Sequence, residues 1–289
     1  MEKGLSSNCL KIIAIIIMVI DHIGGYLYQK IDPNTYYVLR SIGRIAMPIF
    51  AYLIVQGFFY TKNLKKYIFR IFVLATITQI GLLVLGIINQ EYYPNYVTGV
   101  NNYFGVVYSY FLSLILLGIV DEKKIIKKLN EKQNLFIRIN LFIILLFIYL
   151  KLKIEFDMVV PFLILEFYGI EKLFEKDNQL ILKQKKDVRK KSLYLLLILI
   201  CLTISTVLIG YSSGCKYMMI ASAILIALYN GNSGKKNRLI QWLFYLVFPM
   251  QHVILYLLAM VIWIWRTKKY IVLKNDIKWG TIIIWLKFT

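Results

Sequence analysis

The chain has 289 residues, of which 59% are hydrophobic, and its mean hydropathy is +0.65. These values argue against a soluble protein with one packed core and predict an integral membrane protein with several helical spans. Lysines and arginines in the cytoplasmic loops of such a protein explain the formal net charge of +20, so no nucleic-acid partner is predicted.

Repeated apolar segments predict nine membrane-spanning helices. At about 1.5 Å per helical residue, roughly 20 apolar residues cross a hydrocarbon core of about 30 Å. The predicted spans are residues 10–28, 39–60, 67–88, 103–120, 135–150, 156–174, 193–211, 217–229 and 239–265. Residues 271–289 are interrupted by charges, and we interpret them as an interfacial segment. Since no repeat or linker divides the chain, we predict one all-α membrane domain over residues 1–289, a transmembrane bundle of about nine or ten spans.

Basic loops predict the orientation of this bundle. If nine spans alternate, four lysine-rich and arginine-rich loops fall on one side, which makes that side and the N-terminus cytoplasmic in a multi-pass protein of the cell membrane. These loops contain Lys62, Lys65 and Lys66; Lys123, Lys124, Lys127, Lys128 and Lys132; Lys183, Lys185, Lys186, Arg189, Lys190 and Lys191; and Lys235, Lys236 and Arg238. Three basic residues do not fit this orientation, because Arg266, Lys268 and Lys269 follow the ninth span and would lie on the external side of the membrane.

The first span carries the polar pair Asp21 and His22. An ionisable group inside a membrane costs roughly 2.5–3.5 kcal/mol on insertion scales, so such a pair is a candidate functional site. The alternative is an aspartate that only ties two helices together. The span lacks a small-residue cleavage site, so we predict that it is retained as the first helix of the bundle.

Two arginines and a second histidine are the other polar residues of interest within predicted spans. Arg40 and Arg44 lie one helical turn apart, so both guanidinium groups project from one helix face. Arg44 is the deeper of the two, and we expect it to bind either Asp21 or an anionic group of a substrate. The chain has two histidines, His22 and His252, and both fall within predicted spans, where imidazoles commonly serve in proton transfer.

With these residues assembled, the chain resembles the TraX family of membrane acetyltransferases. The matching stretches are LKIIAIIIMVIDHIG at residues 10–24, IGRIAMPIFAYLIVQGFFY at 42–60, ALYNG at 227–231 and WLFYLVFP at 242–249. They lie in the same order as in the family and anchor both ends of the chain. Residues 135–210 match only in hydropathy. The combination of these motifs is specific, whereas each one alone is weak.

The resemblance implies N-terminal acetylation of a pilin, with acetyl-CoA as the donor. No metal is predicted, because Cys9, Cys201 and Cys215 show no metal-ligand spacing. The resemblance also implies that Asp21 and His22 are catalytic and that Arg44 is functional. The other candidates for substrate or cofactor binding are Arg40, Tyr229, Asn230, Lys235 and Tyr245. One departure concerns His252, the third catalytic candidate. The family pattern has one residue between the proline and the histidine, whereas here two residues follow Pro249. Because one residue rotates a helix by about 100°, His252 is not certain to face the site.

The chemistry of acetyl transfer assigns roles to these residues. His22 is the candidate general base, and Asp21, which points about 100° away from it, is expected to orient Arg44 or to hold the substrate amine. The phosphates of coenzyme A would be attracted to the basic cytoplasmic loops, chiefly Lys62, Lys65, Lys66, Lys235, Lys236 and Arg238. The expected partners are a coenzyme A thioester, a protein or peptide acceptor and membrane lipid.

Three other readings stay open from the residues alone. The chain could be an O-acetyltransferase of a cell-envelope glycan, a proton-coupled transporter that uses Asp21, His22 and Arg44 as a relay, or a nonenzymatic membrane subunit of a conjugation apparatus. The transporter is expected to have paired broken helices in two repeated halves, and the sequence has no such symmetry.

Overall fold

The computed structural model describes residues 4–28, 30–89, 104–121, 131–156, 158–175, 188–208, 214–232, 234 and 244–262. Within these ranges the chain is helical, apart from short turns and two isolated bridges that pair Leu5 with Tyr229 and Phe104 with Ile154. The helices are α1 (Ser7–Tyr26), α2 (Pro33–Gly43), α3 (Ala46–Tyr60), α4 (Leu64–Asn89), α6 (Val106–Val120), α7 (Glu131–Lys151), α8 (Val159–Glu175), α10 (Val188–Leu208), the 3-10 helix η1 (Gly214–Ala221), α11 (Ser222–Ala227) and a final helix over Phe244–Ile262.

The helical membrane class is confirmed, but the described helices support fewer spans than the sequence predicts. Five of the described helices are long and apolar enough to cross a membrane, namely Ser7–Tyr26, Pro33–Tyr60, Leu64–Ile87, Lys132–Lys151 and Phe244–Ile262. Three more apolar helices are shorter, namely Val106–Val120, Ser192–Val207 and Lys216–Ala227. A helix of 15 residues such as α6 reaches only about 22 Å, which is less than the thickness of a bilayer core. The interfacial segment predicted for residues 271–289 lies outside the described residues.

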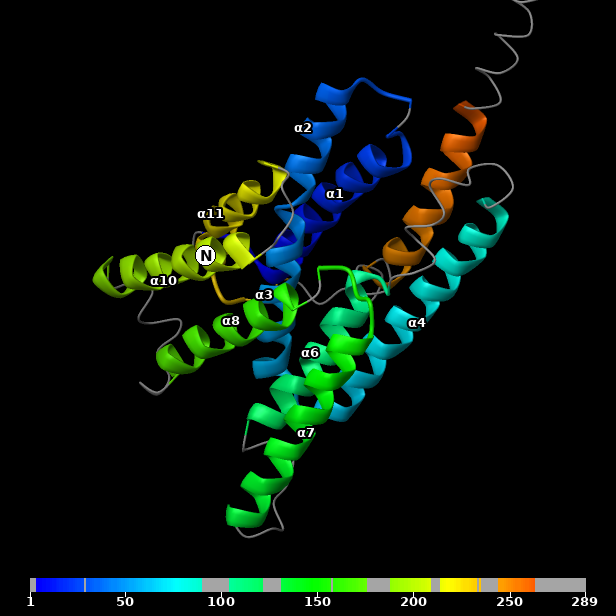
Figure 1. Cartoon of the computed structure of the whole chain (residues 1–289). Helices are drawn as coiled ribbons and strands as arrows, with labels where there is room; N and C mark the ends of the chain where they lie inside the picture. The colour runs from blue at the N-terminus through cyan, green and yellow to red at the C-terminus, as the bar shows by residue number, and fades with distance from the viewer. Residues whose placement is uncertain are drawn as a thin grey trace, which may run out of the picture.

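α3 forms the buried centre of the molecule. Eleven of its 15 residues are buried, and it packs against α1, α6 and α8. Figure 1 shows α3 near the middle of the molecule, with α8 and α10 extending to one side and α4 running along the other. Large apolar side chains on α4, α7 and the Phe244–Ile262 helix are exposed, which is typical of surfaces that face lipid.

The sequence explains where the second predicted span is broken. Residues 39–60 were predicted to form one span, and they lie in the candidate span Pro33–Tyr60, within which α2 ends at Gly43 and α3 begins at Ala46. Pro48 lacks the N–H group that would bond to the carbonyl group of Arg44, and its ring crowds that same carbonyl. The break therefore falls beside Arg44. α2 itself begins at Pro33, after the side chain of Asp32 accepts a hydrogen bond from the N–H group of Thr35 at 3.0 Å.

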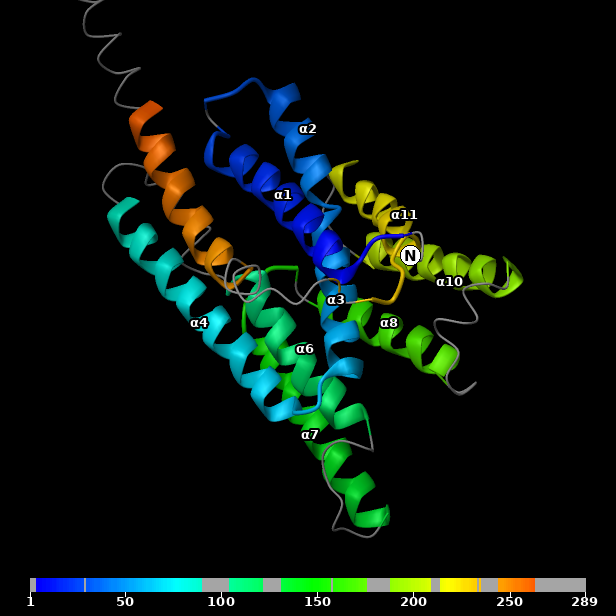
Figure 2. The same ribbon diagram turned by 180° about the vertical axis from the view of Figure 1, so that it is seen from behind.

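Two neighbours flank α1. α2 packs closely along it, and the Phe244–Ile262 helix runs parallel to it, as Figure 2 also shows from behind. The two helices are parallel because successive contacts lie closer to the C-terminal end of both helices. Lys11 lies over the ring of Phe244, Gln251 donates a hydrogen bond to the sulfur of Met18, and Lys30 donates to the carbonyl of Ala259. These contacts bring the end of the described chain against its beginning.

Candidate active site

An ion-pair cluster joins α1 to α2. Arg40 Nη1 lies 2.7 Å from Asp21 Oδ2, and Arg44 Nη2 lies 3.2 Å from Asp21 Oδ1 and 3.4 Å from Oδ2. The side chains are only 14–25% exposed. This arrangement is possible because Gly43 has no side chain, since a Cβ atom there would lie 2.1 Å from Cβ of Asp21. The predicted pairing of Arg44 with Asp21 is present, and Arg40 joins it.

The two histidines meet on the other side of α1. The rings of His22 and His252 form an edge contact, with centroids 4.7 Å apart and an angle of 75° between the ring planes. Nδ1 of His252 lies 3.2 Å from the hydroxyl of Tyr26, and Nδ1 of His22 is a buried atom without a hydrogen-bond partner among the described residues. The extra residue after Pro249 therefore does not carry His252 away from His22.

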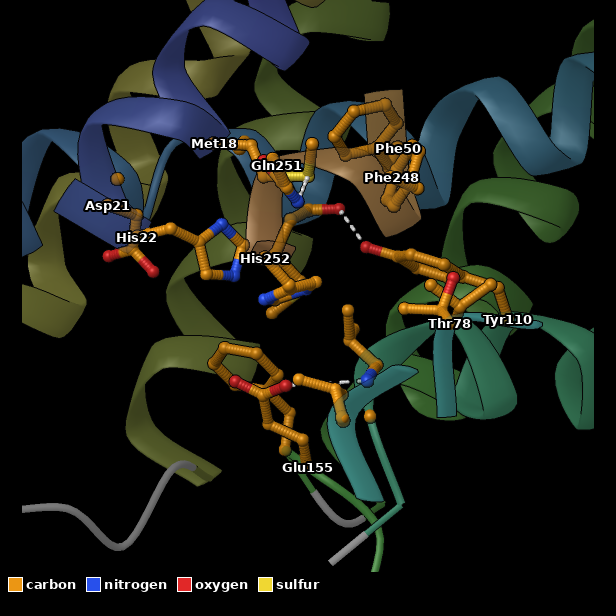
Figure 3. Close-up of a pocket in the computed structure, with 18 of the residues that line it drawn as sticks. Met18, Asp21, His22, Phe50, Thr78, Tyr110, Glu155, Phe248, Gln251 and His252 are labelled. Atoms are coloured by element: carbon orange, nitrogen blue, oxygen red, sulfur yellow. Dashed lines mark hydrogen bonds between the residues drawn. The ribbon is translucent and has the colours of Figure 1, made fainter. Parts of the chain in front are cut away.

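These groups surround a cavity of about 80 Å³. Figure 3 shows His22 entering from α1, Gln251 and His252 from the final helix, and Glu155 from the turn between α7 and α8. Its apolar wall includes Phe50 and Phe248, whose rings are in edge contact at 5.2 Å. The remaining lining residues are Met18, Asp21, Gly43, Arg44, Ala46, Met47, Thr78, Leu82, Gly105, Val106, Val107, Tyr110 and Phe156.

A short turn supplies the far wall of the cavity. The backbone of Lys153 and Glu155 hydrogen-bonds to both polar groups of Phe104, which fixes the turn beside the start of α6. Phe156 has a φ of 64°, a conformation that costs a bulky side chain of order 1–3 kcal/mol and is found mainly at functional sites. The guanidinium carbon of Arg44 lies 5.2 Å from the centre of the Phe156 ring, so the turn also contacts the ion-pair cluster.

Glu155 is the second carboxyl group of the cavity. Its Oε2 atom accepts a hydrogen bond from the N–H group of Val106 at 3.3 Å, the first residue of α6, whose N-cap residue Gly105 provides no side-chain cap. The surrounding protein raises the pKa of Glu155, and the positive charge of Arg44 opposes this effect. The residue nevertheless stays exposed to solvent, so a ligand can reach it.

Several lining residues were not predicted from the sequence. Glu155 and Phe156 lie in a turn that hydrogen-bonds to Phe104, which is about 50 positions away in the sequence. No local sequence pattern predicts that contact. Gln251 is only 5% exposed. A polar side chain in the middle of an apolar span is a signal that could have identified it.

Other predicted binding residues do not reach the cavity. The backbone N–H of Asn230 donates to Leu5 before α1 begins, and Tyr229 packs edge-on against Tyr52. These residues therefore lie near the start of α1 at Ser7. His22 is 15 residues further along the helix, which corresponds to about 22 Å. Tyr245 is partly buried in the final helix but does not line the cavity, and Lys235 lies outside the described residues.

The part of the chain that the structure describes contains no group of three or more His, Cys, Asp or Glu side chains that could hold a metal ion. The chemistry available in the cavity is that of imidazole, carboxylate, guanidinium, amide and hydroxyl groups. Such a set can move protons and stabilise negative charge.

Comparisons with known proteins give one family and two partial relatives. Residues 6–259 match the family described as "TraX protein". Over 84 residues the chain is 37% identical to the "Probable fimbrial assembly protein FimC, serogroup H1" of Dichelobacter nodosus, which covers 29% of this chain and 30% of that protein. Over 58 residues it is 41% identical to "Uncharacterized protein RP591" of Rickettsia prowazekii (strain Madrid E), covering 20% of this chain and 21% of that protein. No solved structure matches the chain significantly.

Proposed function

This chain belongs to the TraX protein family, and on that premise we propose that it is a membrane-embedded acetyltransferase. It moves the acetyl group of acetyl-CoA to the N-terminal amine of a membrane-associated, pilin-like protein or peptide. The observation that carries the proposal is the meeting of His22, His252 and Arg44 at one small cavity, although these residues come from distant parts of the chain. The partial likeness to a fimbrial assembly protein favours an acceptor of the pilin type.

The residues of the cavity account for each step of the transfer. The imidazole of His22 accepts a proton from the acceptor amine, whose nitrogen then attacks the carbonyl carbon of the thioester. The C–S bond breaks, the attacking nitrogen gives up a second proton, which the thiolate of the leaving coenzyme A takes up, and the acceptor becomes an amide. Arg44, which Asp21 and Phe156 hold in position, stabilises the negative oxygen of the tetrahedral intermediate. His252 lies against His22, so the proton that His22 has accepted can move by way of His252 toward Tyr26.

The donor approaches from the side of the basic loops. Lys62 is exposed between α3 and α4, Lys65 and Lys66 are exposed in the first turn of α4, and their charges attract the phosphates of coenzyme A. The other predicted coenzyme-binding cations, Lys235, Lys236 and Arg238, lie outside the described residues.

Membranes that contain the protein, incubated with acetyl-labelled acetyl-CoA, test the proposal. We expect label at the N-terminus of an envelope protein or peptide, and no label in membranes that carry the His22→Ala variant at the same level. Label in a glycan would instead support an O-acetyltransferase. The absence of any transfer by the wild-type protein, with folding verified, would contradict enzymatic activity and favour a transporter or a structural subunit.

A further inference from the structure

The two carboxyl groups of the cavity differ in how their charges are balanced. Asp21 binds two guanidinium groups, at 2.7 and 3.2 Å. Glu155, in contrast, has no cationic side chain within 4.0 Å among the described residues. Because a carboxylate at the wall of a cavity favours a cationic partner, and Glu155 has none in direct contact, a positively charged ligand can bind there.

The position of Glu155 is fixed and leaves part of its carboxylate available. Its backbone N–H donates to the carbonyl of Phe104 at 2.8 Å, and its Oε2 atom accepts from the N–H group of Val106. The structure gives Oε1 no such partner within the described ranges. The carboxylate can therefore act as a cap of α6 and bind a ligand at the same time.

Two further polar atoms in the cavity also lack partners. Oε1 of Gln251 and Nδ1 of His22 are buried and have no hydrogen-bond partner among the described residues. Leaving a buried polar atom unpaired is costly, so these atoms indicate a ligand that donates hydrogen bonds. An ammonium group donates three, whereas a hydroxyl group donates one.

We propose that Glu155 is the residue that binds the acceptor, holding its protonated primary amine at the cavity before His22 removes the proton. This assignment rests on the proposed acetyl transfer and specifies its acceptor as an amine. The volume of about 80 Å³ is well below the roughly 300–1,000 Å³ of pockets that enclose a whole small-molecule ligand, so only the reacting end of the acceptor enters. Glu155 thereby selects a charged chain terminus over a neutral sugar hydroxyl.

Binding of a peptide tests this role without requiring catalysis. The probes are a short synthetic peptide with a free N-terminus and the same peptide with an N-acetyl cap, each titrated into the purified full-length protein. In Glu155→Gln the amide oxygen can still accept from Val106, so α6 stays capped while the charge is lost. Glu166→Gln is the matched control, because Glu166 bonds to Ser205 and does not line the cavity.

We expect the wild-type protein and Glu166→Gln to bind the free-amine peptide about 10-fold or more tightly than the capped one. Glu155→Gln should bind both peptides equally. A preference for the free amine that survives in Glu155→Gln, or that is absent from the wild type, would overturn the assignment.

The pH dependence of wild-type binding gives a test that needs no variant. The preference requires an ionised Glu155 and a protonated amine, so it should fade as the pH falls through the raised pKa of Glu155. It should fade again above the amine pKa of about 8. Asp21, His22, Arg44 and His252 also line the cavity, and Arg40 contacts Asp21 from outside it. The contribution of these groups is what persists in the Glu155→Gln profile. A flat wild-type profile would also overturn the assignment.

Kinetics separate a failure of this inference from a failure of the proposed function. With acetyl-CoA and the free-amine peptide, Glu155→Gln should raise KM about 10-fold and leave kcat nearly unchanged, and Glu155→Asp should restore part of the loss. Transfer with an unchanged KM in Glu155→Gln would refute the role of Glu155 alone. Glu155-dependent peptide binding without any transfer by the wild type would refute the acetyltransferase and leave the amine site standing.

Discussion

Asp21 binds two arginines, but the contacts of the two arginines differ. Arg44 reaches both carboxylate oxygens, lies over the Phe156 ring and lines the cavity. Arg40 makes the shortest ion pair, at 2.7 Å, but does not line the cavity. Arg40 therefore balances the charge of Asp21 from behind, while Arg44 presents its guanidinium group to the substrates.

Substitution of the two arginines by lysine should separate these roles. We expect Arg44→Lys to lower acetyl transfer about 10-fold or more, because an ammonium group cannot contact Asp21 and lie over the Phe156 ring at the same time, as the planar guanidinium does. Arg40→Lys keeps a single charged contact and should lose much less. Transfer rates of the two purified variants, normalised to folded protein, provide the comparison. Equal tolerance at both positions would reduce Arg44 to a membrane anchor.

His22 carries the largest share of the proposed chemistry. We expect His22→Ala to insert and purify normally, because the change removes a polar group from the membrane and opens at most a small void. Transfer should fall about 100-fold or more, which is the usual contribution of a positioned base. Single-turnover rates measure the effect. If a folded His22→Ala protein kept near wild-type rates, the base would have to be His252 or Asp21.

The close approach of α1 and α2 depends on two glycines. A Cβ atom at Gly43 would overlap Asp21 at 2.1 Å, and one at Gly24 would lie 3.0 Å from Cβ of Leu39. Small residues commonly allow such contacts between membrane helices. A glycine is therefore required at position 43, since a larger residue would push Asp21 away from both guanidinium groups.

Gly43→Ala tests this contact directly. The added methyl group must force the two helices apart, so we expect a destabilisation of about 1–3 kcal/mol together with reduced acetyl transfer. Gly81→Ala in α4 is the matched control, because a Cβ atom there has no heavy atom within 4 Å. It should leave stability unchanged or raise it by up to about 1 kcal/mol. Thermal unfolding in detergent distinguishes the two, and equal melting temperatures would contradict the close contact.

Local sequence signals predicted the elements better than the contacts between them. Long apolar runs located α1 and α4. The one-turn spacing of Arg40 and Arg44 predicted that both project from one helix face, and both of them bind Asp21. Length alone failed at residues 217–229, where a 3-10 helix is followed by only six α-helical residues. Residues 39–60 lie within the candidate span Pro33–Tyr60, although a short turn beside Arg44 divides that span into α2 and α3. Glu155 was not predicted as a site residue, because its position depends on backbone hydrogen bonds between its turn and Phe104. Tertiary packing determines these bonds.

The parallel packing of α1 and the Phe244–Ile262 helix constrains the chain as a whole. Both helices run in the same direction, and an alternating bundle of nine spans requires this of its first and last members. The geometry relates the two helices to each other but not to the sides of the membrane. The basic loops supply that information, because they are predicted to face the cytoplasm.

Cysteine labelling of intact cells tests the orientation. In a background with Cys9, Cys201 and Cys215 replaced by alanine, a probe cysteine at Asn95 should react with a membrane-impermeant reagent added from outside. Cysteines at Asn130 or Ser233 should react only after the membrane is opened, because their loops are basic or adjoin basic residues. Acetyl transfer by each labelled variant serves as the check on folding. The reverse pattern would move the basic loops outside, away from the cytosolic pool of coenzyme A. The donor would then need another entrance, and His22 could still act as the base while Lys62, Lys65 and Lys66 lost their role in binding the coenzyme.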